Sequence, residues 1–274
     1  MLPALAAAQS ADAPVEFICP MDRGVRSPKP GRCSRCGMKL VPGIPDAVAY
    51  PVSVRMTPVA PLAGSRVQIQ FTVRHPRTGA RITAFEQVHE KLYHAFVISQ
   101  DLGFFEHAHP RLGQRGEFRL DAVLPKPGMY RILSDFFPRG GTPQMVESTV
   151  IVAGGPVAPG TSLEPDLSPK STENLRVSLR VEPERPIAGM KTMLVCTLNP
   201  ATGLEPYLGA WGHMLAASGD LIDMIHSHPF LAEGGAEVQF NVIFPRAGVH
   251  RVWVQFQRKG VVNTARFDIP VKAI

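Results

Sequence analysis

Six of the nine histidines in this 274-residue chain follow one spacing that occurs twice. In each case a histidine is followed, after twelve residues, by a His-x-His-Pro segment. The two triads are His94, His107 and His109, and His213, His226 and His228, with corresponding members 119 residues apart. Three neutral imidazoles with an open fourth position suit copper(II) or zinc. The alternative is structural, because a histidine before proline can bond the backbone at a strand end, and repeats inherit such a feature together.

A β-hairpin would bring each triad to one face of a sheet. Residues i and i+2 of a strand share a face, so His107 and His109 lie side by side. If Asp101-Leu102 is the hairpin centre, His94 lies opposite His109 across roughly 5 Å. The same construction about Asp220-Leu221 gathers the second triad. A slip of one residue would move His94 to the other face, so the prediction depends on this register.

Three residues are candidates for a fourth or supporting ligand: Asp135, Met145 and Met224. Met224 precedes His226 by two residues and therefore shares its face in a regular strand. The second half of the chain (repeat two) matches the first (repeat one) at an offset of 119–120 residues. Repeat two has Gln255 where repeat one has Asp135, which allows the two sites to differ. The other histidines fall outside the repeated spacing, and we interpret them as ordinary residues: His75, His89 and His250.

Three of the four cysteines, Cys19, Cys33 and Cys36, lie in a segment too short to build a core, residues 16–43. A disulfide could stabilise it. However, the odd number and the Cys33-x-x-Cys36 turn favour a metal, because a two-residue gap turns both sulfurs toward one ion. A purely structural zinc knuckle is the alternative. The fourth cysteine, Cys196, lies in a strand-like run and is expected in the core.

Two motifs in this segment are specific: Phe17-Ile-Cys19-Pro20-Met21, and Gly31-Arg-Cys33-Ser-Arg-Cys36-Gly37-Met38. They resemble the heavy-metal-binding domain attached to copper/silver efflux adaptors and metal-transport ATPases. The resemblance implies that the cysteines bind a soft metal, with Met21 and Met38 as further candidate ligands. Asp22 stands where the family has histidine, and an oxygen ligand suits zinc better than copper(I). Alternatively, Met21 or Met38 completes a copper(I) site and Asp22 is not a ligand.

The elements that must position the histidines are strands. Alternating runs such as Arg66–Val73 and Leu175–Val181, with 24 glycines and 27 prolines, indicate short strands and turns. We predict an all-β chain of two tandem immunoglobulin-like or cupredoxin-like β-sandwiches, preceded by a small metal-stabilised Cys-rich module. The expected segments are a leader (1–15), the Cys module (16–43), sandwich one (48–153), a linker by composition (154–172) and sandwich two (173–274).

Both repeats also resemble the periplasmic β-sandwich segments that often accompany the heavy-metal-binding domain. The resemblance rests on Phe104–Pro110, Pro127–Arg131 and Asp135-Phe136. It implies an immunoglobulin-like fold and a metal-linked context, without an established activity.

Charge and hydropathy exclude several classes of protein. The net charge of +6 is scattered, with no run of five basic residues, so we expect no nucleic-acid binding. Ala6-Ala7-Ala8 resembles the end of a secretory signal, which predicts a periplasmic or secreted protein. No later stretch is apolar for 18 residues, so no transmembrane helix is expected.

These observations predict an extracytoplasmic protein that binds metal ions for buffering, delivery or tolerance. The expected metal is copper, as Cu+ or Cu2+, with zinc as the alternative. The competing interpretation is an accessory interaction module of a metal-efflux assembly, with an efflux component as partner and only a structural metal site. We expect no enzyme, because the chain has no G-x-S-x-G or H-E-x-x-H motif. An open three-histidine site still permits copper or zinc catalysis.

Overall fold

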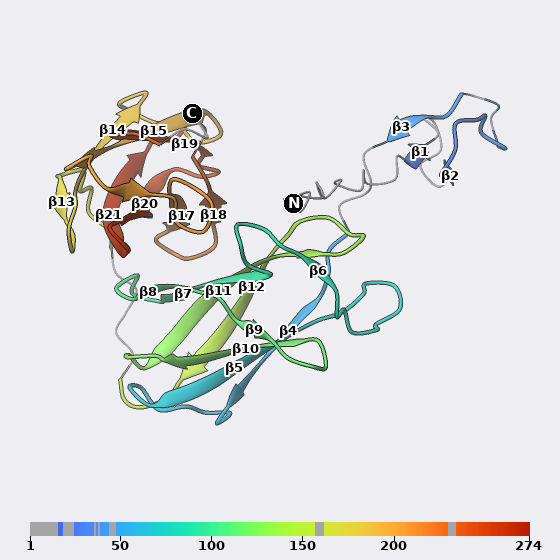
Figure 1. Ribbon diagram of the computed structural model, residues 1–274, viewed down its shortest axis with the longest axis horizontal. Coiled ribbons are helices and arrows are strands. Elements are labelled where there is room, and N and C mark those ends of the chain that lie inside the picture. Colours follow the sequence, from blue (N-terminus) through green and yellow to red (C-terminus); the bar gives the residue numbers. More distant parts are fainter. Residues whose placement is uncertain are drawn as a thin grey trace, which may run out of the picture. The chain divides into compact units, whose positions relative to one another are not determined.

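The computed structural model describes residues 16–18, 25–35, 37, 39–43, 48–156, 162–229 and 234–274. All regular structure in these ranges is β-strand, as the sequence predicts (Figure 1). The described part of the chain contains no helix that could span a membrane. Two compact units are present: the described residues up to Ala49 with Arg139–Thr142, and a larger unit of Tyr50–Pro138 with Pro143–Ile274.

The smaller unit contains a three-stranded antiparallel sheet of order β2-β1-β3. Its strands are β1 (Glu16–Ile18), β2 (Arg26–Ser27) and β3 (Val41–Gly43). Cys33 and Leu40 form its buried centre, with Phe17 and Val25 partly buried beside them. So small an apolar cluster is far below what an independent domain needs, which is consistent with the expected metal staple.

The first sandwich consists of a sheet of order β4-β5-β10-β9 and a sheet of order β12-β11-β7-β8, with β6 also pairing with β11. The strands are β4 (Val52–Thr57), β5 (Arg66–Val73), β6 (Phe85–Glu86), β7 (Tyr93–Ser99), β8 (Phe105–Ala108), β9 (Arg111–Leu112), β10 (Glu117–Val123), β11 (Gly128–Pro138) and β12 (Gln144–Val152). With β4, β5 and β10 in one sheet and β12, β11 and β7 in the other, the strands have the order A-B-E and G-F-C of immunoglobulin-like folds. The rings of Tyr93 and Phe118, 4.6 Å apart, lie in the core between the two sheets.

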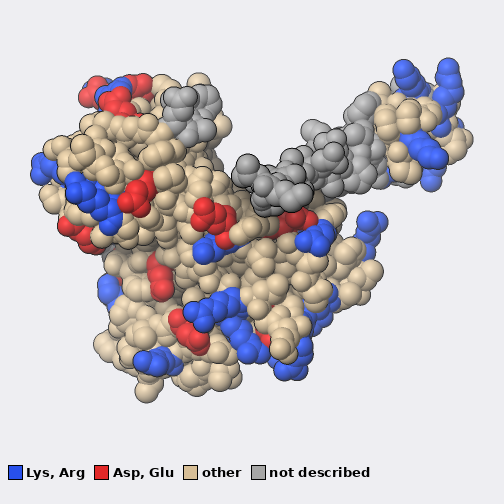
Figure 2. Space-filling model, viewed as in Figure 1, with Lys and Arg blue, Asp and Glu red and all other residues tan. Residues whose placement is uncertain are grey.

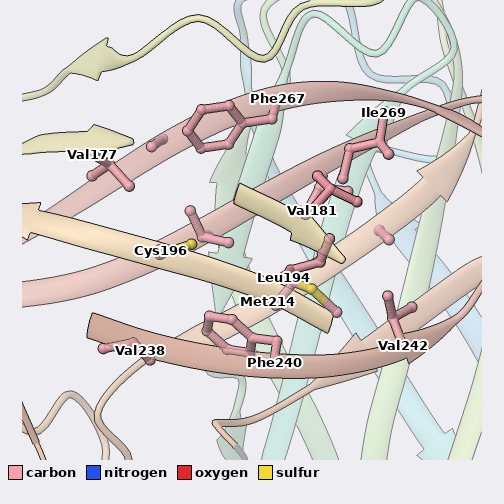
Figure 3. Close-up of a cluster of buried hydrophobic side chains, with 14 of the residues drawn as sticks. Val177, Val181, Leu194, Cys196, Met214, Val238, Phe240, Val242, Phe267 and Ile269 are labelled. Atoms are coloured by element: carbon pink, nitrogen blue, oxygen red, sulfur yellow. The ribbon is translucent and has the colours of Figure 1, made fainter. Parts of the chain in front are cut away.

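The second sandwich repeats this arrangement, with β13-β14-β15-β19 in one sheet and β21-β20-β17-β18 in the other. Its strands are β13 (Lys170–Ser171), β14 (Arg176–Glu182), β15 (Lys191–Asn199), β16 (Leu204–Glu205), β17 (His213–Ser218), β18 (Met224–Ser227), β19 (Glu237–Ile243), β20 (Gly248–Arg258) and β21 (Val261–Val271). Figure 3 shows Cys196 inside this core beside Leu194 and Phe240. Burial raises the pKa of the Cys196 thiol to about 12, and its predicted core position is confirmed.

A third apolar cluster joins the two sandwiches. Strands β7 and β17 are buried along their whole length because one face lines the sandwich core and the other lies against the opposite sandwich. Phe96 and Leu133 from repeat one meet Leu215 and Trp253 from repeat two. The guanidinium of Arg251, paired with Asp268, also donates a hydrogen bond of 2.9 Å to the carbonyl of Leu102.

The segment expected as a linker contributes to the folded unit where it is described. Leu163 is buried in the cluster between the sandwiches. Asp166 exchanges two backbone hydrogen bonds with Asp268 on β21. The segment boundaries themselves stay predictions. Figure 2 shows acidic and basic side chains intermixed over one face of the protein, in keeping with the scattered charge of the sequence.

Truncating the fully buried Phe240 to alanine should destabilise the second sandwich by about 3–5 kcal/mol, because it leaves a cavity in a close-packed core. Ile243→Ala is the matched control, because Ile243 lies on the same strand and is 56% exposed. Urea unfolding followed by fluorescence checks this, since both tryptophans, Trp211 and Trp253, lie in repeat two. Equal losses for the two variants would contradict the assigned core.

Candidate metal centre

The hairpins that carry the triads have the register predicted from the sequence. Phe96 pairs with His107 across β7 and β8, which places His94 opposite His109. Leu215 pairs with His226 across β17 and β18, which places His213 opposite His228 in the same way. Each triad therefore lies on one face of its sheet, and this is the face turned toward the other sandwich.

Hydrogen bonds fix the position of the proton on two histidines of the first triad, His94 and His107. His94 Nε2 donates to the carbonyl of Val88 at 2.9 Å, and His107 Nδ1 donates to Gln255 Oε1 at 2.8 Å. A second bond, from Gln255 Nε2 to Thr264, sets the orientation of that amide. A neutral imidazole has only one N–H, so His94 Nδ1 and His107 Nε2, 3.0 Å apart, face each other as lone pairs.

The second triad is built similarly, but its short contact joins the first and third histidines rather than the first and second. His213 Nε2 donates to the carbonyl of Tyr207 at 2.8 Å, and His226 Nδ1 donates to Asp135 Oδ2 at 2.7 Å. His213 Nδ1 lies 3.1 Å from His228 Nε2. Among the described residues, neither the buried His226 Nε2 nor the buried His109 Nε2 of the first triad has a hydrogen-bond partner. Buried nitrogens of this kind need a proton donor or a metal ion to offset the loss of water.

Burial favours the uncharged form of five imidazoles in the two triads: His94, His107, His109, His213 and His228. It is the main cause that lowers the pKa of His109 to about 4 and that of His213 to about 3. The pKa values of His94, His107 and His228 are lowered in the same direction and for the same main reason. At neutral pH these lone pairs are therefore available, which is the protonation state that a metal ligand requires.

The spacing of the nitrogens fits one ion per triad. In each triad the three ligand atoms lie within 4.8 Å of one another. Two nitrogens bound ~2.0–2.1 Å from one ion, at roughly 90–110°, would stand about 2.9–3.4 Å apart. The pairs at 3.0 and 3.1 Å already have this separation. The hydrogen bonds to carbonyl, amide and carboxylate oxygens act as the outer support that metal-bound histidines usually have.

The two triads adjoin each other across the interface. The ring centres of His107 and His213 are 5.3 Å apart, and those of His94 and His226 are 6.2 Å apart. Asp135, one of the candidates from the sequence, orients a histidine of the opposite repeat rather than one of its own. Gln255 does the same in the reverse direction.

The other sequence candidates lie elsewhere. Met145 is opposite Asp135 on β12 and is 57% exposed. Met224 belongs to the apolar cluster between the sandwiches. His75 accepts backbone hydrogen bonds from Arg77 and Thr78 in a turn, and His250 is buried beside Phe244. None of these four side chains belongs to either group of converging nitrogens among the described residues.

The repeated spacing predicts an ordinary role for His89, but the structure places it against the second triad. Its ring stacks on His228 with centres 3.6 Å apart. The sequence contains only a weak signal for this residue, because it lies in a turn of repeat one and its partner lies in repeat two. Its backbone has a φ of 47°, in the left-handed region that histidine adopts more readily than most side chains.

In the Cys module, Cys33 is the one predicted ligand that the structure describes. Its Sγ accepts a hydrogen bond from the backbone N–H of Arg35 at 3.4 Å, and its carbonyl accepts one from Gly37 at 2.9 Å. Gly37 has a φ of 75°, which closes this tight turn. The other predicted ligands lie outside the described residues, and their roles stay predictions: Cys19, Met21, Asp22, Cys36 and Met38.

Metal-free protein should lose stability as the pH falls below about 6.5 toward 4. The pKa of His109 is about 4 in the folded state and about 6.5 when unfolded, so in this window the unfolded state binds more protons. Thermal melting of chelator-treated protein between pH 7.5 and 4.5 measures the slope, which His109→Gln should reduce. If the stability of His109→Gln depended on pH as steeply as that of wild type, His109 would not be a source of the pH dependence.

Comparison with known proteins finds two family models that match parts of this chain. No curated protein matches the chain. Among solved structures, the Escherichia coli adhesin FdeC is 14% identical (85% of this chain, 67% of that chain; TM-score 0.29). The Yersinia pseudotuberculosis adhesin InvE is 8% identical (83% of this chain, 61% of that chain; TM-score 0.28). These likenesses carry no argument about function. Residues 17–42 match the heavy metal binding domain. Residues 47–154 and 170–273 match the domain of unknown function DUF8832, and the chain therefore belongs to the DUF8832 family.

Proposed function

We propose that this chain is an extracytoplasmic transition-metal-binding protein whose histidine triads hold copper, or alternatively zinc, for buffering, delivery or tolerance. The observation that carries the proposal is the pair of facing nitrogens in the first triad. Both His94 and His107 use their single proton on another partner, so two lone pairs converge at 3.0 Å. A cation between them turns this repulsion into two coordinate bonds.

The type of ligand favours copper over zinc. Neutral imidazole suits both ions, and at a given site of nitrogen ligands divalent copper binds more tightly than zinc. The heavy metal binding domain at residues 17–42 supports a role in metal handling. Its cysteines favour a soft ion such as Cu+, while the triads suit Cu2+ or Zn2+.

Two parts of the proposal rest on the sequence alone. The location outside the cytoplasm rests on the Ala-rich segment within residues 1–15, and fractionation of cells that express the chain tests it. The absence of catalysis rests on the lack of recognised motifs. Oxidase and hydrolase assays of copper- and zinc-loaded protein test that part, and turnover that disappears with the triads would overturn it.

The central experiment measures bound metal by ICP-MS. Wild-type protein is loaded with copper or zinc, dialysed, and compared with a His107→Ala/His226→Ala variant. We expect wild type to retain two metal ions more than the variant, because each substitution removes one converging nitrogen. A His75→Ala/His250→Ala variant removes two histidines outside the triads and should retain the wild-type amount.

Equal metal content in wild type and the His107→Ala/His226→Ala variant would refute the role of the triads. Any ion that remained would then belong to the Cys module. That result would favour an accessory interaction module of a metal-efflux assembly with one structural metal site.

A further inference from the structure

We propose that the two triads form one two-metal centre with unequal sites. In this centre the triad of repeat two, supported by Asp135, binds its ion more tightly than the triad of repeat one, supported by Gln255. The inference rests on the proposed metal binding and goes further, because it assigns an order of filling and a role to residues outside the triads.

Each site is completed by the other repeat. The proton of His226 is held by Asp135 of repeat one, and the proton of His107 is held by Gln255 of repeat two. On the strands, Asp135 lies opposite His94 and Gln255 lies opposite His213, so the exchange is reciprocal. If the sandwiches separated, His226 would lose its hydrogen bond to Asp135 and His107 would lose its hydrogen bond to Gln255. The two sites are therefore one structural unit.

The charges around the two triads differ. Asp135 supplies a negative charge that bonds directly to a histidine of the second triad, whereas Gln255 is neutral. The turn whose Val88 carbonyl holds His94 also carries a positively charged side chain, Lys91. The residue of repeat two that corresponds to Lys91, by the 119-residue offset, is Ala210. A cation therefore meets attraction at one site and some repulsion at the other.

The turns that support the triads also differ, and this difference again favours the second triad. Val88–Lys91 and Tyr207–Ala210 are corresponding turns, and each supplies the carbonyl that fixes the first histidine of its own triad. The second residue is His89 in one turn and Leu208 in the other, and both have a positive φ. His89 covers the second triad by stacking on His228, so the tighter site gains an additional imidazole that the first site lacks.

Proximity then couples the two sites. Rings of opposite triads lie 5.3–6.4 Å apart between centres, so two dications bound there would repel each other in a partly buried setting. The first ion should enter the second triad, and the second ion should bind the first triad more weakly.

Competition titrations with Cu2+ and a chelator of known affinity test the order. Asp135→Asn keeps the shape of the side chain and removes its charge, and it should weaken the tighter site about 10- to 100-fold. Gln255→Glu makes the opposite change and should tighten the weaker site. Asp121→Asn, a carboxylate bonded to Gln68 on the exposed face of the first sandwich, is the control and should change neither affinity.

Electron paramagnetic resonance tests whether the sites adjoin. Two nearby Cu2+ ions give a half-field signal through their magnetic coupling. We expect it in fully loaded wild type, and we expect its loss in His107→Ala and in His226→Ala, each of which should still bind one ion in the triads.

The outcomes separate this inference from the proposed function. If the triads bind no metal, the proposed function fails. If two ions bind with equal affinities that Asp135→Asn and Gln255→Glu leave unchanged, the proposed function stands and the inequality is overturned. Two bound Cu2+ ions without a half-field signal would overturn the two-metal centre.

Discussion

The rest of the site depends on a simple constraint: a neutral imidazole has one proton and two nitrogens. A hydrogen bond from one ring nitrogen to an oxygen leaves a lone pair on the other. In both triads the first histidine donates to the carbonyl of a turn, so its Nδ1 points into the triad. Burial prevents a second proton from relieving the resulting repulsion, because a charged ring would lose its hydration. In the first triad the two facing lone pairs of His94 and His107 are an arrangement that a cation would stabilise.

The packing of the two sandwiches against each other buries the histidines and supplies the partners of their protons. Strands β7 and β17 would each expose an apolar face with a histidine at one end if the sandwiches stood apart. Packed together, Phe96, Leu215 and Trp253 exclude water from the interface. The same contact brings Asp135 and Gln255 to the histidines that they orient. Apolar burial therefore supplies the stability of the interface, and the polar groups set its chemistry.

Much of the fold and of each triad could be predicted because both follow from short-range periodicity. A strand repeats every two residues, so the spacing of His94, His107 and His109 fixes their common face once the hairpin centre is known. The match between the two halves of the chain then supports the same arrangement twice. Cys196 was placed in the core for the same reason, from its strand-like surroundings.

The meeting of the two triads could not be predicted in this way. Periodicity tells which residues share a face but not what covers that face. The continuous apolar run Tyr93–Ser99 is typical of a strand buried on both sides. It does not indicate which part of the chain covers the second side. For the same reason the sequence does not indicate that Asp135 supports the triad of the opposite repeat, or that His89 lies beside the site. Its role depends on a contact with His228, 139 residues away in the sequence.

The most direct test of the central claim is a crystal structure of the copper-loaded protein with anomalous diffraction data collected on both sides of the copper absorption edge. The account predicts two copper peaks at the interface of the sandwiches. One should lie among His94 Nδ1, His107 Nε2 and His109 Nε2, and the other among the corresponding nitrogens of His213, His226 and His228. Well-ordered triads without a copper peak, in crystals whose copper lies only in the Cys module, would contradict it.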